Sequence, residues 1–495
     1  MNRGVAWILC VPALFLSLDT QAQVGPNAGV ANTPARNEKP KISPQQAEEL
    51  FQSVEEILKF VSEDTKFPIQ HKIKRKLVDR DTVEHDLTER LKNDEDSQRM
   101  EHAELVLKKF GFLPRDFHLR QFFISMMREQ VAGYYNIKDQ TVYLLDWIEP
   151  AAQRAILAHE LTHALQDQNF HLEKWNKAPG DEKDKKKKWS PENLDPTQES
   201  IDDERLVARV ALLEGQGMAE LLDYALAPRG RNVNNSPVEV DGLKRGMTED
   251  KQSPIFNSAP RFLKESLVFP YREGLTFVQE VMFKKGREGA FAGTMANPPK
   301  TTREIMQPST YLAQEKIPPL VLPKLQPILG SGYSGYDAGA MGEFDVSIFL
   351  TQFRDPEKRA DGLYREWRGG SYFAALRCDL TPCESSTAQQ KKNQNAVAAP
   401  PTSALALLYF SRWSSPDAAD KFAKQYRDAL LKRYKFAQGV APRVGDAPTT
   451  RWTTDEGLVS IETRGDQVLV LESFDEAAMK RLWDAIWQPA APATN

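Results

Sequence analysis

A helix with two chemically different faces is the strongest constraint on how this chain can fold. The segment 151–168 follows Pro150, which favours the first turn of a helix. On a helical wheel with about 100° per residue, its apolar side chains gather on one side: Leu157, Ala158, Leu161, Ala164 and Leu165. Its polar side chains share the opposite face, within an arc of roughly 100°: His159, Glu160, His163 and Asp167. The segment predicts a helix with a core face and a face of reactive groups.

The spacing of the two histidines is typical of a metal site. Side chains four residues apart project from the same face of a helix, so His159 and His163 can reach one Zn²⁺ ion. Glu160 lies at the edge of such a site, where it can act as a general base on water activated by the metal. Asp167 is one turn beyond and either orients a ligand or is a solvated acid. A pattern of five residues also arises by chance, so a metal site needs support from other parts of the sequence.

A catalytic zinc site needs a third protein ligand, and no histidine follows His171. The segment 203–226 predicts a long helix with an apolar stripe, and Glu214 lies within that stripe. A buried, ionised carboxylate costs several kcal/mol unless it is paired or bound to a metal ion. Glu214 is therefore the predicted third ligand, and the alternative is an ion pair with a buried arginine.

Other residues of this second helix have different expected roles. Asp203 and Glu204 are weaker candidates for the third ligand. Glu220 falls on the polar face of the wheel and is expected at the surface. Gly215 and Gly217 permit close approach of another backbone, at a cost to the helix of roughly 1 kcal/mol each.

The stretch HELTHALQD, residues 159–167, is very similar to the zinc-binding helix of thermolysin-like metallopeptidases. A helix with two histidines and a glutamate on a later helix resembles the pattern of the gluzincins, the peptidase MA-like group. The resemblance covers about 125–225, with weaker echoes to about 375. It implies a zincin-like catalytic core in which His159, His163 and Glu214 bind one zinc ion. It also implies that Glu160 is the general base.

Two features depart from that family pattern. The spacing between the histidines and Glu214 is longer than in thermolysin, and a lysine-rich insertion at about 171–200 accounts for it. The family's later histidine, which stabilises the oxyanion, is missing, so a tyrosine would have to serve. The candidates are Tyr134, Tyr333, Tyr336 and Tyr372.

A β-hairpin is predicted directly before the metal helix. Two β-prone runs flank residues 136–140 within the segment 133–145. An exposed edge strand beside a peptidase cleft can bind an extended substrate by strand addition, so we expect this hairpin along the zinc cleft. The alternative is a hairpin packed in the core.

The N-terminus has the features of an export signal. Arg3 precedes an apolar run of about fourteen residues, too short for a typical membrane span. Residues 1–22 are the predicted signal peptide, and an uncleaved anchor is the alternative. Residues 23–42 are the predicted flexible linker, and Ser43 is the predicted N-cap of the first helix, with Gln46 three residues on.

Composition changes divide the remaining chain. Residues 43–382 form the predicted helical, zincin-like metallopeptidase region, with its core at about 119–226. Residues 383–402 are of low complexity and predict a linker. Residues 403–495 alternate strand and helix patterns and predict a small α+β accessory domain. The expected fold class is α+β and mostly helical.

Two smaller features remain open at the level of sequence. If Cys10 leaves with the signal peptide, Cys378 and Cys383 are the remaining cysteines, and they form a small disulfide loop or stay reduced. Residues 231–260 show no clear periodicity and are expected to be loop-like.

The function that these patterns favour is an exported zinc metallopeptidase acting on peptide or protein substrates. The alternative is a non-catalytic exported binding or scaffold protein with a structural zinc site; a zinc hydrolase acting on other substrates is a third. The 495-residue chain has a net charge of −4 and no strongly basic segment large enough to indicate nucleic-acid binding. No second apolar run predicts membrane insertion after the signal is removed.

Overall fold

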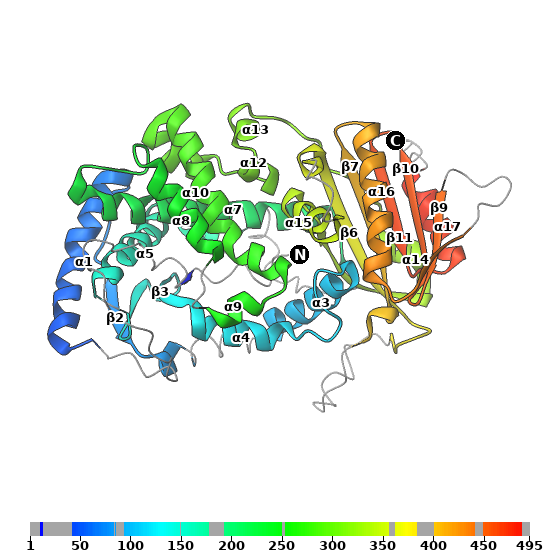
Figure 1. Ribbon diagram of the computed structural model, residues 1–495, viewed down its shortest axis with the longest axis horizontal. Helices are drawn as coiled ribbons and strands as arrows, with labels where there is room; N and C mark the ends of the chain where they lie inside the picture. Colours follow the sequence, from blue (N-terminus) through cyan, green and yellow to red (C-terminus); the bar gives the residue numbers. More distant parts are fainter. Residues whose placement is uncertain are drawn as a thin grey trace, which may run out of the picture.

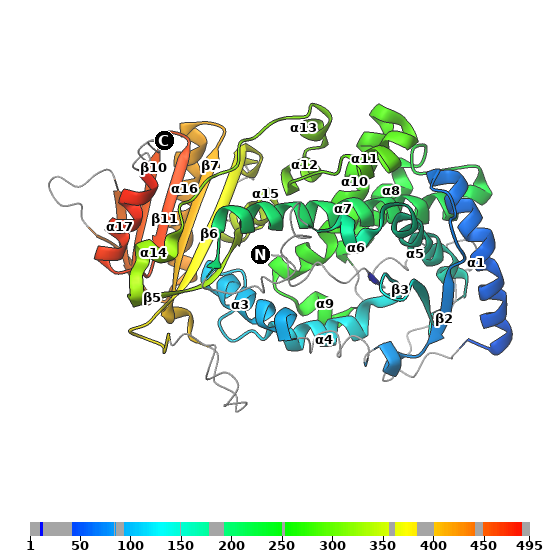
Figure 2. The ribbon, with the colours of Figure 1, turned by 180° about the vertical axis from the view of Figure 1, so that it is seen from behind.

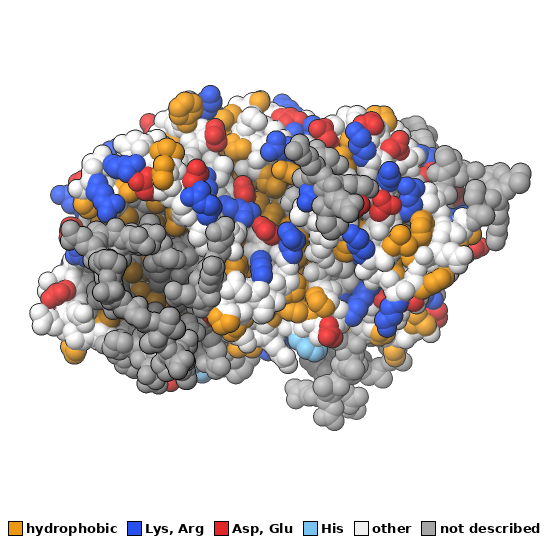
Figure 3. Space-filling view, viewed as in Figure 1, with side chains coloured by type: hydrophobic (Ala, Val, Ile, Leu, Met, Phe, Trp, Pro, Cys, Tyr) orange, Lys and Arg blue, Asp and Glu red, His pale blue; other side chains and the backbone are white. Residues whose placement is uncertain are grey.

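The computed structural model describes residues 10–12, 42–83, 85, 94–148, 150–177, 193–249, 253–355, 362–383, 400–440 and 449–487. A larger helical part and a large antiparallel sheet lie side by side in an elongated molecule (Figure 1). The predicted class, α+β and mostly helical, is confirmed. On the face shown in Figure 3, positive and negative side chains are interspersed.

The elements follow the chain in a simple order. The helices up to the large sheet are α1 (Pro44–Thr65), α3 (Asp94–Phe110), α4 (Leu119–Gln130), α5 (Pro150–Phe170), α6 (Leu172–Trp175), α7 (Pro196–Leu226), α8 (Pro237–Glu249), α9 (Pro254–Ser258), α10 (Arg261–Glu288), α11 (Thr294–Ala296), α12 (Thr302–Met306) and α13 (Pro308–Leu312). The later helices are α14 (Leu325–Leu329), α15 (Glu343–Phe353), α16 (Pro416–Arg433) and α17 (Glu476–Trp487). A π-helical turn, η4 (Gly289–Gly293), follows α10.

The first helix shows how local sequence sets an element. Ser43 accepts a hydrogen bond from the backbone N–H of Gln46, and the Gln46 side chain accepts one from the Ser43 backbone. This predicted capping box satisfies donors that a helix start leaves open. Apolar residues at helical spacing then bury one face of α1, among them Val54, Ile57 and Val61.

Helix α7 runs along the length of the molecule, from the large sheet to the region of α5 (Figure 2). Its 31 residues span about 46 Å. Its C-terminal half packs against α5 and α10, and its N-terminal half reaches strands of the large sheet. One helix thus connects the metal-ligand candidates with the rest of the fold.

A small sheet lies against the metal helix. Its strands are β1 (Cys10–Pro12), β2 (Lys74–Val78), β3 (Val131–Asn136) and β4 (Thr141–Leu145), in the order β1-β3-β4-β2. β3 and β4 form the predicted hairpin, and β2 runs parallel to β4. β1, which lies inside the expected signal peptide, pairs antiparallel with β3. The hairpin is therefore part of a four-stranded sheet in which β1 is the edge strand and β3 lies next to it.

The large sheet crosses the expected domain boundary. Its strands are β5 (Tyr333–Ala340), β6 (Trp367–Arg377), β7 (Leu405–Trp413), β8 (Ala437–Val440), β9 (Thr449–Thr454), β10 (Gly457–Arg464) and β11 (Gln467–Glu472), in the order β5-β6-β7-β11-β10-β9-β8. β6 and β7 are direct neighbours, although 383–402 separates them in the chain. Strands β7 to β11 thus complete a sheet whose first two strands precede that linker, so the described part of 403–495 does not form the separate domain that was expected.

Alternating side chains of β7 explain why the tail does not stand alone. Tyr409 faces α16 and belongs to the main core, which continues into the helical part. Phe410 faces the other way and packs on α17, in a smaller core with α14. α16 and α17 therefore cover opposite faces of the sheet (Figure 1).

Buried polar contacts also attach the tail to α3. Lys109 of α3 is fully buried and pairs with Glu456 at 2.8 Å. Arg433 of α16 donates to the backbone carbonyl of Lys109 at 2.6 Å and pairs with Glu472 of β11 at 2.9 Å. Separating the tail from α3 would leave these buried charges without partners, which is strongly destabilising. The contacts therefore hold the two parts of the fold together.

The remaining sequence expectations have mixed outcomes. Residues 237–249 and 254–258 are helical, which corrects the loop expected over 231–260, because α8 and α9 bury apolar residues at sites such as Phe256. Cys378 and Cys383 form a disulfide, one of the two alternatives. Among the described helices, none has the length and apolar character needed to cross a bilayer.

Candidate metal centre

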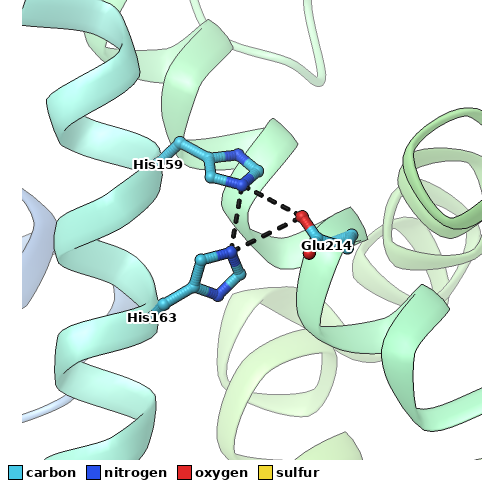
Figure 4. A group of neighbouring side chains, drawn as sticks. All are labelled: His159, His163 and Glu214. Carbon is cyan, nitrogen blue, oxygen red and sulfur yellow. Dashed lines mark hydrogen bonds and ion pairs between the residues drawn. The ribbon is translucent and has the colours of Figure 1, made fainter. Parts of the chain in front are cut away.

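Three side chains from two helices meet inside the helical part (Figure 4). Nε2 of His159 lies 3.0 Å from Nε2 of His163 and 3.1 Å from Oε2 of Glu214. Nε2 of His163 is 3.5 Å from the same Oε2. All three residues are at most 1% exposed. The structure thus brings together the three residues that the sequence predicts as metal ligands, here called the ligand triangle.

The ligand triangle has the dimensions that a tetrahedral zinc ion requires. Zinc lies about 2.0–2.2 Å from nitrogen and oxygen ligands, which sets neighbouring donor atoms about 3.3 Å apart. The observed separations of 3.0, 3.1 and 3.5 Å bracket that value. Two imidazoles and one carboxylate also leave a fourth position for water or substrate, as catalytic zinc sites do. The residues present therefore fit zinc in both chemistry and spacing.

The electrostatics of the ligand triangle favour a cation. Burial alone would raise the pKa of Glu214, but His163 and His159 outweigh it and hold that pKa at about 2. Burial alone would lower the pKa of His163, but Glu214 outweighs it and raises that pKa to about 9. Burial lowers the pKa of His159, with Glu214 opposing the shift. An ionised carboxylate thus shares the site with one imidazolium, whose proton a metal ion can replace.

Two glycines of α7 make this packing possible. A Cβ on Gly217 would lie 2.7 Å from ring atoms of His159, so no other residue fits beside that imidazole. A Cβ on Gly215 would lie 2.2 Å from the backbone of Gly274 in α10. The close backbone approach predicted for these glycines is therefore present at Gly215, where it places α10 against the helix that carries Glu214, whereas Gly217 is approached by a side chain, the His159 ring.

Glu160 is buried between the metal helix and the small sheet. It is 1% exposed, next to His159 on α5. A Cβ on Gly133 of β3 would lie 3.7 Å from Cγ of Glu160, so the hairpin lies on the Glu160 side of the helix. All five residues of β4 are buried, and β4 has a neighbour on both sides. β3 also has a neighbour on both sides, because β1 pairs with its outer edge and β4 with its inner edge.

Asp167 has a different role from either one expected. It is 6% exposed and accepts hydrogen bonds from the Tyr135 hydroxyl at 2.9 Å and the Leu172 N–H at 3.1 Å. These contacts join α5 to β3 and α6, which corrects both the ligand-orienting and the solvated interpretation. Nδ1 of His163 instead lies 2.8 Å from Oε1 of Gln166. The sequence interpretation missed Gln166, although its i+3 spacing from His163 places both side chains on one helix face.

Asp203 and Glu204 lie away from the ligand triangle. Glu204 is about 15 Å from Glu214 along α7 and accepts hydrogen bonds from the Thr302 N–H and hydroxyl, each at 2.9 Å. Asp203 accepts a hydrogen bond from the Ala340 N–H at 3.0 Å. Both are corrected as ligand candidates, because their position on α7 faces α12 and the end of β5.

The carboxyl cluster around Glu204 predicts pH-dependent stability. Burial, with neighbouring carboxylates, raises the pKa of Glu204 to about 8, of Asp337 to about 7 and of Asp345 to about 6. Acids with a raised pKa in the fold stabilise it fully below their ordinary pKa, and this contribution is lost as the pH rises through the folded pKa. We expect the free energy of unfolding to fall between pH 5 and pH 9. Since a pKa that differs by one between the folded and unfolded states corresponds to about 1.4 kcal/mol, the fall should be on the order of a few kcal/mol.

Thermal unfolding of two variants across that pH range tests this expectation. Glu204→Gln should flatten the profile, because the glutamine keeps the shape of the protonated acid and cannot ionise. Glu63→Gln, at a site with a side chain 69% exposed, should leave the slope unchanged. A parent protein that becomes more stable from pH 5 to pH 9 would contradict the assignment.

Glu220 is not the surface residue expected from the wheel. It is fully buried and pairs with Arg287, which also contacts Asp223 and Asp64. Burial raises the pKa of Glu220 well above its usual value, although Arg287 opposes the shift. The polar face of α7 thus packs against α1 and the end of α10, with the guanidinium between the carboxylates.

The structure gives three of the four candidate tyrosines other partners. Tyr333 donates a hydrogen bond to Asp475 and Tyr372 donates one to Asp337, each at 2.9 Å. Tyr336 stacks on a histidine of α3, with ring centroids 3.9 Å apart. All three belong to the large sheet, and none of these contacts involves the ligand triangle.

A tyrosine outside the expected set lies beside the metal helix. Tyr271 of α10 is 5% exposed, and its ring centroid is 6.3 Å from that of His159. The fourth expected candidate, Tyr134, stacks on Tyr143 within the hairpin at 4.5 Å. Tyr271 was missed because its place depends on the crossing of α7 and α10 at Gly215 and its partner glycine, which the sequence alone does not reveal.

Comparison with known protein families, with characterised proteins and with solved structures finds no match to this chain.

Proposed function

We propose that this protein is an exported zinc metallopeptidase that hydrolyses peptide bonds within a zincin-like catalytic core. The observation that carries the proposal is the ligand triangle: two imidazoles and one carboxylate, buried, with donor atoms 3.0 to 3.5 Å apart. A purely structural zinc site needs no adjacent base, yet Glu160 directly follows the first histidine in the same buried helix turn. The combination of open coordination and adjacent base favours hydrolysis.

Each residue has a separate task in the proposed reaction. His159, His163 and Glu214 hold the zinc ion, which when bound polarises the scissile carbonyl and lowers the pKa of water. Glu160 accepts the proton of the attacking water and passes it to the leaving amine. We assign to Tyr271, whose ring centroid lies 6.3 Å from that of His159, the hydrogen bond to the developing oxyanion.

The small sheet supports a way to bind an extended peptide. β1 pairs antiparallel with the outer edge of β3, with Val11 opposite Gly133. Gly133 is also the residue that lies against Glu160. This edge therefore accepts an extended segment beside the proposed general base. Removal of the proposed signal peptide would leave the edge available, and strand addition gives affinity through main-chain hydrogen bonds.

Metal removal tests the proposal directly. We expect the purified protein to contain one zinc ion, to hydrolyse an unfolded protein such as casein, and to lose that activity with a chelator and regain it with added zinc. Zinc content and peptide release would be measured on the same samples. Bound zinc with no hydrolysis of any peptide substrate would favour a binding or scaffold protein instead, and absence of bound zinc would contradict the metal site.

A further inference from the structure

A chain of buried amides leads from the ligand triangle to a distant segment. Nδ1 of His163 lies 2.8 Å from Oε1 of Gln166. Nε2 of Gln166 donates to Oε1 of Gln216 at 2.8 Å. Nε2 of Gln216 then donates to the backbone carbonyls of Ala290 at 2.9 Å and Phe291 at 3.2 Å. Both glutamines are fully buried, and the chain of contacts is here called the amide relay.

The far end of the amide relay fixes its direction. Backbone carbonyls can only accept hydrogen bonds, so Gln216 must present its NH₂ group to Ala290 and Phe291. Thr294 strengthens this constraint, because its hydroxyl donates to the Ala290 carbonyl at 2.6 Å and accepts from Gln216 at 3.1 Å. Turning the Gln216 amide round would place its oxygen against two carbonyl oxygens that can only accept, so neither contact would be a hydrogen bond.

The orientation of Gln216 also fixes the orientation of Gln166 and the position of the proton on His163. With its NH₂ group engaged, Gln216 offers only its oxygen to Gln166, so Gln166 must donate its own NH₂ group there. Oε1 of Gln166 is then the atom that faces His163, and it can only accept. Nδ1 of His163 must therefore carry a proton, which leaves Nε2 to face the ligand triangle.

The π-helical turn η4 supplies the anchor. Residues 289–293 leave the regular α-helical hydrogen-bond pattern, and the carbonyls of Ala290 and Phe291 within this turn accept from Gln216. Such turns often occur at functional sites. A role in fixing the relay gives this local departure from helix geometry a physical reason.

We propose that Gln166 and Gln216 are positioning residues that hold His163 with its proton on Nδ1 and with Nε2 turned toward the metal. The inference deepens the proposed function and rests on it for the identity of the ion. Groups that orient a metal-bound histidine in this way typically change metal affinity by 10–100-fold when removed. Neither glutamine belongs to the ligand triangle: Gln166 contacts His163 directly, and Gln216 acts on it through Gln166.

The chain provides a matched control on the same helix. Gln168 is also buried, 4% exposed, but its side chain bonds to the backbone of Gln70 and His71 near β2. Gln166→Met and Gln168→Met therefore remove the same group from the same helix, two residues apart. Both should lower thermal stability, but only the first should affect the ligand triangle. Gln216→Met removes the middle of the amide relay without touching His163.

Two measurements on these three variants and the parent test the relay. Chelator competition should show zinc bound 10–100-fold more weakly by Gln166→Met and Gln216→Met, and with parental affinity by Gln168→Met. In metal-free protein labelled with ¹⁵N-histidine, the parent and Gln168→Met should show a hydrogen-bonded Nδ1–H resonance of His163. Gln166→Met and Gln216→Met should lose or shift it.

The two readouts separate the relay from the proposed function. If the parent binds no zinc, the metal site is wrong, and the nuclear magnetic resonance signal still decides the relay. If the parent binds zinc but Gln166→Met and Gln216→Met keep both the affinity and the signal, the relay is wrong and the metal site stands. Should one of the variants Gln166→Met and Gln216→Met fail to fold, the other still gives both readouts. An equal loss of zinc affinity and of the Nδ1–H signal in Gln168→Met would mean that the effect is general destabilisation, and the relay would be wrong.

Discussion

Replacing Glu160 with glutamine is expected to lower the rate of peptide hydrolysis by about 10²–10⁴-fold while zinc stays bound, as is typical when a general base is removed. Glutamine keeps the shape of the side chain but cannot accept the proton of the attacking water. The ligand triangle is made by other residues, so its three donor atoms remain in place. The turnover number and zinc content would be measured on the same preparation.

A matched surface substitution shows whether the loss is specific. Glu173→Gln, in α6 directly after the metal helix, changes a side chain that is 73% exposed. It should leave both hydrolysis and zinc content at the parental level. Near-full activity in Glu160→Gln would mean that another group activates the water, and the assigned mechanism would then be wrong.

The ligand triangle shows what a local pattern can predict. His159 and His163 lie one turn apart on a single helix, so helix geometry alone places both imidazoles on one face. Glu214 was identified by a conflict within its own helix, an ionisable side chain in an apolar stripe. Both signals come from the period of the α-helix, which the chain carries locally. The pairing of the two helices then follows from the chemistry that the three side chains share.

Glu220 shows where the same reasoning stops. The wheel gives the direction in which a side chain points, but it does not say what packs there. The partner of Glu220 is Arg287, far along the chain at the end of α10, and α1 adds Asp64. A polar stripe can therefore be an internal ion-pair cluster as readily as a solvated surface when a long helix is surrounded on several sides.

The large sheet shows a second limit of local reasoning. A low-complexity stretch at 383–402 changes composition but does not end a hydrogen-bonded sheet. Strand pairing is non-local, so β6 and β7 can be neighbours whatever connects them. Strand patterns were recognisable within 403–495, but β5 and β6 before the linker were not predicted, and neither were the partners of any strand in this sheet. The position of Tyr271 could not be predicted for the same reason, since it depends on the crossing of two helices that lie far apart in the sequence.

Two glutamates of α7 allow the sharpest test of the metal site, because they share a helix and are equally buried. Glu214 is 1% exposed and Glu220 is fully buried, and each faces cationic partners. Their electrostatics differ in sign. The imidazoles hold the pKa of Glu214 at about 2 against the effect of burial, whereas burial raises the pKa of Glu220 well above its usual value. Glutamine therefore removes a charge at one site and resembles the protonated form at the other.

Glu214→Gln is expected to weaken zinc binding by more than the roughly 100-fold upper range seen for groups outside the coordination shell. It should also destabilise the metal-free protein by about 3–5 kcal/mol, because it removes the main counter-charge of the buried His163 imidazolium. Glu220→Gln should keep the zinc affinity of the parent, since Arg287 retains Asp223 and Asp64 as partners. Chelator competition and denaturant unfolding of both variants and the parent would measure these effects. Parental zinc affinity in Glu214→Gln would remove that residue from the coordination shell, and an equal loss in both variants would show that zinc binding only follows the stability of α7.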